Sequence, residues 1–189
     1  YYGAMEKVGI HKRDIMADRV ESARDSQAEA QEQFKSALEQ FSSVVRLEET
    51  DLKKAYDRLN GEYQDCLGAA EEVSSRIAKV ESVSEALFDE WQDELRLYQN
   101  QELARSSRQQ LQATRENYRQ LMTRMRRAEQ SMKPVLEIFQ DNVLFLKHNL
   151  NAQAIGSLQS EFANLEIEIE RLIDRMEEAI TASDNFIAE

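Results

Sequence analysis

The sequence predicts an all-α fold, an elongated antiparallel up-down-up-down helical bundle, on three observations. The chain has 189 residues with only one proline and five glycines, so little in it interrupts a helix. Apolar residues recur in alternating steps of four and three over long stretches, which is the heptad spacing of coiled coils. Four such stretches are separated by short polar corners, and short corners make successive helices antiparallel.

The first predicted helix spans residues 12–47. Its apolar stripe, called the seam here and in the other helices, runs from Met16 to Val44 with Gln27 as its one polar member. After the seam ends, the run from Glu48 to Asp51 supplies an N-cap and acidic side chains for the start of the next helix.

The second helix is predicted at residues 51–98, with a seam from Leu52 to Trp91. Gly61 and Gly68 lie seven residues apart and therefore on one face. Because the seam keeps its phase across them, we expect an unbroken helix with close packing beside the small residues.

The third and fourth helices are predicted at residues 101–149 and 152–188, as parts of one domain of 189 residues. Pro134 lies inside the third seam. Since proline removes one backbone hydrogen bond, it should kink this helix without ending it. Heptad seams pack equally well within one chain and between chains. The sequence therefore allows two alternatives, a bundle formed by one chain and a bundle formed by two copies.

The predicted lengths place an overhang at one end. The middle two helices would be roughly 70 Å long and the outer two roughly 55 Å, with residue 12 opposite about residue 86. The overhanging hairpin carries much apolar surface, and we expect the segment 1–11 to cover it, with bends at Gly3 and Gly9. The residues placed to form this cover or tether are Tyr1, Tyr2, Met5, Val8 and Ile10.

Charge is unevenly distributed along the chain. The net charge is -12, yet the window from Arg96 to Arg127 holds eight arginines and two glutamates. One interpretation is an arginine-rich helix that lies against acidic helices. The other is a phosphate-binding face for lipid headgroups, or less favourably for nucleic acid, which the acidic faces would repel. The membrane or partner tip predicted from this pattern comprises Phe88, Trp91, Arg96, Leu97, Tyr98, Arg105 and Arg108.

The corner after the third helix is a second candidate partner surface. Its residues are Leu144, Phe145, His148, Asn149 and Asn151. The run 143–146 is apolar on more than one face, which indicates either a fully covered position or a contact in a homodimer. The alternative to partner binding for the polar residues is a helix C-cap, with asparagine in the left-handed conformation and Lys147 and His148 beside the negative helix end.

The sequence lacks the patterns of enzyme chemistry. Neither His11 nor His148 belongs to a Glu-x-x-His pair, and no zinc, phosphate-loop or nucleophile-elbow motif occurs. We therefore expect no catalytic residues, no cofactor and no metal. Cys66, the one cysteine, lies on the seam and is expected to be a small buried hydrophobe.

Five blocks carry a resemblance to a known family: YYGAMEKVGIHKRDIM, SALEQFSS, ALFDEWQDEL, MRRAEQSMKPVL and VLFLKHNLNAQAIG. Together they resemble an uncharacterised family of Gram-negative bacterial lipoproteins, known as a domain of unknown function, over essentially the whole chain. The resemblance implies a mature periplasmic protein, anchored at the outer membrane through a lipidated cysteine upstream of Tyr1. It implies no activity.

The sequence thus favours a non-enzymatic envelope scaffold or adaptor with protein partners of unknown identity. A peripheral membrane binder that uses the arginine and aromatic tip is the alternative, and a nucleic-acid-associated coiled coil is a distant one.

Overall fold

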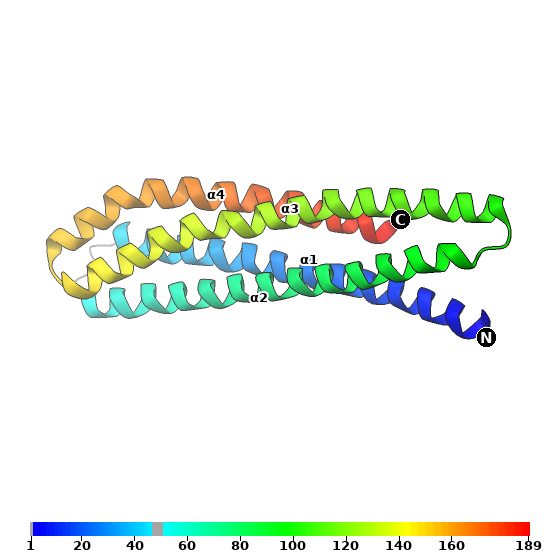
Figure 1. Ribbon diagram of the computed structural model, residues 1–189. Coiled ribbons are helices and arrows are strands. Elements are labelled where there is room, and N and C mark those ends of the chain that lie inside the picture. The colour runs from blue at the N-terminus through cyan, green and yellow to red at the C-terminus, as the bar shows by residue number, and fades with distance from the viewer. Residues whose placement is uncertain (1, 47–50) are drawn as a thin grey trace.

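The computed structural model describes the backbone of residues 2–46 and 51–189, and the side chains of all of these except residues 2–11 and 152. Four long helices form an elongated bundle (Figure 1): α1 (Tyr2–Arg46), α2 (Leu52–Glu94), α3 (Gln101–His148) and α4 (Ala152–Ala188). A short 3₁₀ helix, η1 (Leu95–Leu97), extends α2 into the corner before α3. The described residues contain no strand, which confirms the predicted all-α class.

The helices alternate in direction and form a ring in which each packs against two others. Helix α1 lies between α2 and α4, and α3 closes the ring against the same two helices. The described part of a single chain therefore supplies all four helices of the predicted up-down-up-down bundle.

The core follows the predicted seams. Along α1, every seam residue from Met16 to Val44 is buried, including the polar Gln27. Toward the corner between α3 and α4, the ring of Phe41 lies 5.8 Å from that of Phe139 and 6.0 Å from that of Phe162, centroid to centroid. Aromatic pairs at these separations add stabilisation beyond the area that they bury.

Asparagine and aspartate side chains set the described helix starts. The carboxylate of Asp51 accepts a hydrogen bond from the backbone N–H of Lys54. Asn100 Oδ1 accepts from Glu102 and Leu103, and Asn151 Oδ1 accepts from the two residues that follow Ala152 in α4. Each cap satisfies backbone donors that have no partner inside the helix, so the corners occur where these residues stand.

Helix α1 differs from its prediction. Its backbone is helical from Tyr2, ten residues before the predicted start, so Gly3 and Gly9 are not bends. The length mismatch therefore concerns α4 alone, which has 37 residues against 45 in α1. The side chains of the predicted cover (Tyr1, Tyr2, Met5, Val8 and Ile10) lie outside the described residues.

The two glycines of α2 also differ from expectation. Helix α2 is unbroken, as predicted, but a Cβ added at Gly61 or Gly68 would meet no atom within 4 Å. Both glycines are exposed, so close helix packing is the wrong explanation for them. They lie on the outer face of α2, where nothing in the structure requires a residue without a side chain.

This geometry predicts that Gly61→Ala and Gly68→Ala each stabilise the protein. Alanine in an exposed helix interior is favoured over glycine by about 1 kcal/mol because it restricts the unfolded chain. Chemical denaturation followed by circular dichroism should show a higher midpoint for each variant, with near-additive effects in the double variant. A loss of stability at either position would mean that a neighbour approaches that face.

Candidate functional site

The overhanging end of the bundle, called the tip here and comprising residues 88–111, has a small core of its own. This core contains Phe88, Trp91, Leu95 and Leu111 of the tip, together with Met16 of α1 and the adjoining Leu87 of α2. Helix α4 reaches only the inner edge of this core, where Phe186 packs against it. Glu189, at the end of α4, accepts a hydrogen bond of 2.6 Å from Asn117, so only α1, α2 and α3 extend farther toward the apex (Figure 1).

Helix α1 covers part of the tip. Lys12 forms an ion pair with Glu90, and the guanidinium of Arg13 lies 4.1 Å from the centroid of the Trp91 ring. The prediction placed residue 12 opposite about residue 86, so the observed register is one helical turn farther along α2. A cation over the face of a tryptophan is a stabilising contact, and α1 is therefore attached to the tip from Lys12 onward.

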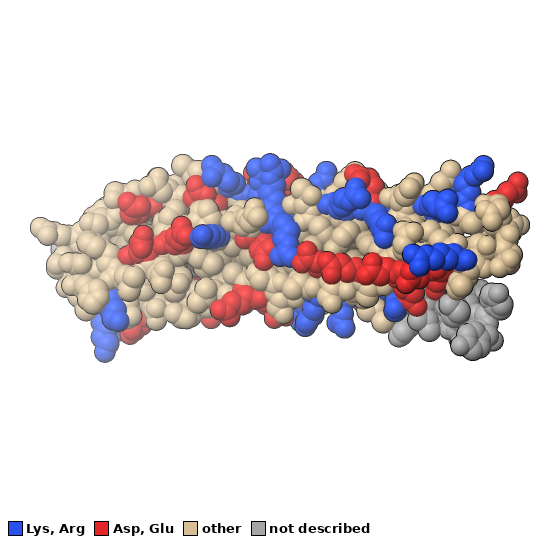
Figure 2. Space-filling model, in the orientation of Figure 1, with Lys and Arg blue, Asp and Glu red and all other residues tan. Residues whose placement is uncertain are grey.

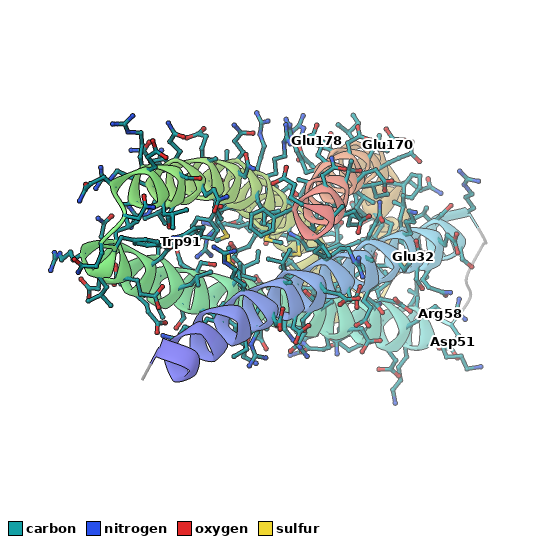
Figure 3. The ribbon with its side chains drawn as sticks, turned by 90° about the vertical axis from the view of Figure 1, so that its right-hand side faces the viewer. Glu32, Asp51, Arg58, Trp91, Glu170 and Glu178 are labelled. Atoms are coloured by element: carbon teal, nitrogen blue, oxygen red, sulfur yellow. The ribbon has the colours of Figure 1, made fainter. Side chains whose placement is uncertain are left out.

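Two of the predicted tip aromatics are structural. Trp91 is 7 % exposed, and its indole N–H donates a hydrogen bond of 2.9 Å to Ser107 Oγ on α3. In Figure 3, which looks onto this end, Trp91 points inward between α2 and α3. Phe88 is also buried and packs edge-on against Tyr118. Neither ring is available to a membrane or partner, which corrects the interfacial role predicted for them.

The other residues that the sequence predicted for a membrane or partner tip do face solvent. Leu97 and Tyr98 are exposed, and so are Arg96, Arg105 and Arg108. The structure adds Leu103, which is 57 % exposed and which the prediction missed. Leu103 lies off the seam of α3, and an apolar residue out of phase beside a corner was the signal that could have identified it.

The arginine window divides into a set with partners and a set without, and the first set includes Arg96 and Arg119, which pair with Asp93 and Glu116. Toward the middle of the bundle, Arg126 lies 2.6 Å from Glu81 on α2 and 3.0 Å from Glu129. The bond to Glu129 is the main cause that raises the pKa of Arg126. Arg115 donates to Gln92 and to the carbonyl of Phe88, both at 3.4 Å. These contacts match the interpretation in which α3 lies against an acidic helix.

The second set has no such partners. Arg105, Arg108, Arg124 and Arg127 are exposed and form no ion pair with a described carboxylate. Figure 2 shows Lys and Arg side chains along the upper right of the molecule, over α3, above a row of acidic side chains over α2. The arginine window is thus only partly neutralised within the chain.

The corner between α3 and α4 is explained in part by capping. Asn149 is the C-cap of α3, and its side-chain N–H donates a hydrogen bond of 3.0 Å to the carbonyl of Phe145. Its φ of -131° is not left-handed, which corrects the predicted form of this cap. His148 is exposed in the last turn, and Asn151 caps α4.

The apolar residues of this corner are not all covered. Leu144 is 45 % exposed and Phe145 is 41 % exposed, whereas Val143 and Leu146 are buried. The alternative in which the whole run is covered within the bundle is therefore wrong. Leu150, in the turn after α3, is 51 % exposed; we call these three residues the far corner (Leu144, Phe145 and Leu150).

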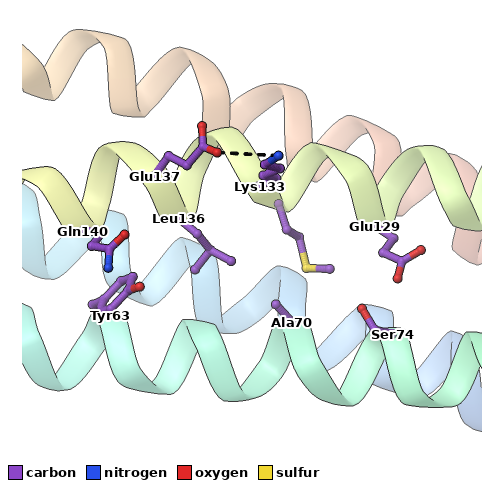
Figure 4. Close-up of a pocket in the computed structure, with 9 residues that line it drawn as sticks. Tyr63, Ala70, Ser74, Glu129, Lys133, Leu136, Glu137 and Gln140 are labelled. Carbon is purple, nitrogen blue, oxygen red and sulfur yellow. Dashed lines mark ion pairs between the residues drawn. The ribbon is translucent and has the colours of Figure 1, made fainter.

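A shallow groove of about 240 Å³ lies between α2 and α3 near mid-length (Figure 4). Ala70 and Ser74 leave space on α2, while Met132 and Leu136 form the α3 side. An ion pair of 3.8 Å between Lys133 and Glu137 stands at the rim. The volume is below the range of about 300–1,000 Å³ usual for small-molecule sites.

No described group of side chains resembles a metal centre. Among the described residues, no cluster of His, Cys, Asp or Glu could hold a metal ion. None of the described helices combines the length and apolar character that a bilayer crossing requires. Cys66 is buried beside Gln33, and burial, with a smaller contribution from Glu62, raises the pKa of its thiol to about 12.

Comparison with known proteins adds a family and no activity. A family model described as "Protein of unknown function (DUF2959)" matches residues 1–189. No curated protein and no solved structure matches the chain.

The burial of Trp91 and the exposure of Tyr98 predict opposite results for truncation. Trp91→Ala should lower the free energy of unfolding by roughly 3–5 kcal/mol, because it leaves a cavity in the tip core. Tyr98→Ala should change it by less than about 0.5 kcal/mol. Guanidinium denaturation of both variants measures the difference. Equal effects would show that the two aromatics are not divided between core and surface.

The raised thiol pKa predicts slow labelling of Cys66 in the folded protein. At pH 8 the native thiol should be almost entirely protonated, and a thiolate is the reactive form. Ellman's reagent should therefore react with Cys66 at the rate of local opening in the folded protein, and rapidly in denaturant.

The same pKa predicts a loss of stability at alkaline pH. Because the pKa of the folded thiol exceeds the ordinary value near 9, the contribution of the protonated Cys66 to the free energy of unfolding is complete below pH 9 and is lost as pH rises toward 12. Cys66→Ala should remove that part of the alkaline loss; rapid native labelling at pH 8 would contradict the assignment.

Proposed function

We propose that this chain, which belongs to the DUF2959 family of unknown function, is a non-enzymatic scaffold or adaptor of the bacterial cell envelope. The single observation that carries the proposal is the length over which the four seams stay buried. Buried residues follow helices of 37 to 48 residues, in a main core and an adjoining tip core, and this makes a stiff rod, roughly 70 Å long by helical rise. A stiff rod suits a protein that holds partners at a fixed separation.

The proposal places a tether at the tip end of the rod. The resemblance of the sequence to lipoproteins supports a lipidated cysteine upstream of Tyr1, in the periplasm and at the outer membrane. Helix α1 begins at the end where α2 turns into α3 (Figure 1). A lipid attached there would hold the tip toward the membrane and the far corner away from it.

The far corner is the surface that we propose for a protein partner. Leu144 and Phe145 near the end of α3, and Leu150 in the turn that follows, all expose apolar side chains. Exposed apolar groups that cluster, rather than occurring singly, mark interaction sites in soluble domains. The partner is a protein of the envelope; a second copy of this chain is the alternative.

The exposed far corner predicts site-specific crosslinking in cells. A photo-reactive phenylalanine analogue at position 145 should give a discrete adduct, which Leu144→Asp with Leu150→Asp should abolish. The matched control is the same analogue at Ile167, which is 54 % exposed on α4. Mass spectrometry of the adduct distinguishes an envelope protein from a second copy.

Two results would contradict the proposal. Position 145 giving no discrete adduct would remove the partner surface, and equal adducts at positions 145 and 167 would show non-specific contact. Membrane fractionation of the same cells, with lipoprotein maturation blocked in one culture, tests the tether separately.

A further inference from the structure

We propose that the tip itself docks on an anionic phospholipid bilayer, with Leu97, Tyr98 and Leu103 inserted and Arg96, Arg105 and Arg108 on lipid phosphates. The inference deepens the proposed function and rests on it only for the orientation of the rod. It concerns direct lipid contact by the folded chain, which a covalent anchor does not require.

The apolar part of this surface is held outward by local structure. In η1, Leu95 turns into the tip core and is 6 % exposed, which leaves Leu97 outward at 49 %. Asn100 caps α3 so that Ala104 and Ser107 face inward and Leu103 faces solvent. The three exposed side chains stand within seven residues of one another at the apex of the rod.

Arg105 and Arg108 lie farther from the apex than the exposed apolar side chains, at a height that suits contact with lipid phosphates. With a rise of 1.5 Å per residue, Arg105 and Arg108 lie roughly 3 and 8 Å farther from the apex along α3 than Leu103. Apolar groups at a membrane interface insert about 5–10 Å into the headgroup and acyl boundary. When Leu103 is inserted to that depth, both guanidinium groups reach the level of the phosphates.

These arginines are free to bind phosphate. The register that pairs Arg126 with Glu81 and Arg115 with Gln92 places Arg108 opposite the corner, beyond the acidic residues of α2. Glu102 is the one carboxylate among residues 95–108, against three arginines. Arg96 lies 3.6 Å from Asp93 in an exposed pair, which contributes little stability and can exchange for a phosphate.

The shape and the surroundings favour a bilayer over other anions. The surface is a convex apex, whereas small anionic ligands bind in concave sites. Nucleic acid would run alongside the rod and meet its acidic faces, while a bilayer meets only the apex. Helix α4, which carries eight acidic residues and two arginines, ends near Asn117 and so stays back from the membrane surface.

The test uses the chain without a covalently attached lipid. Its outcome is therefore independent of the proposed tether and of the partner surface. Vesicles of phosphatidylcholine with about one-third phosphatidylglycerol should co-sediment with the protein, and pure phosphatidylcholine vesicles should bind it at least tenfold more weakly. Arg105→Glu with Arg108→Glu should reduce binding to the anionic vesicles at least tenfold, as should Leu97→Asp with Leu103→Asp. The loss of two cationic contacts near an anionic membrane surface is sufficient for a change of this size.

Matched controls separate the tip from general charge and hydrophobicity. Arg124→Glu with Arg127→Glu removes two free arginines of the same helix outside the tip, and Ile167→Asp removes an exposed apolar residue of α4. Both should bind within twofold of the parent. Because all substituted residues are exposed, unchanged thermal melts are expected; Leu97→Ser with Leu103→Ser replaces the aspartate pair if that pair melts early.

Insertion has a direct optical readout. In Tyr98→Trp, lipids brominated near the headgroup should quench the new tryptophan, whereas buried Trp91 in the parent provides the shielded reference. The proposal is overturned if the parent does not bind anionic vesicles, or if the control pairs lose binding as the tip pairs do. It is also overturned if the tryptophan introduced at position 98 is quenched no more than Trp91.

Discussion

The structure depends on one constraint: each helix must keep its seam turned toward the same axis from one end of the bundle to the other. A step of 3.5 residues drifts slowly around a straight helix of 3.6 residues per turn, so the helices must wind gently about one another to stay in contact. Along that path Phe41, Ile77, Met125 and Leu165 are all fully buried although they come from four different helices. No helix here holds its shape alone, because the stability of each comes from the face that it buries.

Two buried glutamines of α1 connect it to α3 and α4. Gln27 is completely buried, and its amide donates a hydrogen bond of 3.4 Å to the carbonyl of Met125, from α1 across the core to α3. One turn later, Gln31 donates to the carbonyl of Ile173 on α4. Gln27 Oε1 is buried without a hydrogen-bond partner in the described structure, which costs stability. Both acceptors are backbone carbonyls, which recur along α3 and α4, so these bonds hold α1 to the two helices without selecting one register by themselves.

The fold could be predicted from the sequence because its determinants are local and repeated. Seam phase, the caps at Asp51, Asn100 and Asn151, and the short corners lie within a few residues of the features that they set. The site was predicted less well because burial at the tip depends on how far each helix extends. The glycines near the start of α1 indicated bends, yet the helix runs through them and reaches Trp91. Spacing within α2 could not show that a residue of α1 would cover that ring.

The short α4 connects this architecture to the proposals. Phe186, near the end of α4, packs only against the inner edge of the tip core. If α4 matched α3 in length, it would cover the rest of this core and carry its carboxylates to the apex. Since it ends near Asn117, the tip is closed instead by contacts at its own level, such as Trp91 with Ser107 and with Arg13. These contacts turn the large aromatics inward and leave small patches of leucine, tyrosine and arginine at the apex. A surface that binds lipid reversibly needs this division, because side chains that enter a bilayer must not be the ones that hold the end of the rod together.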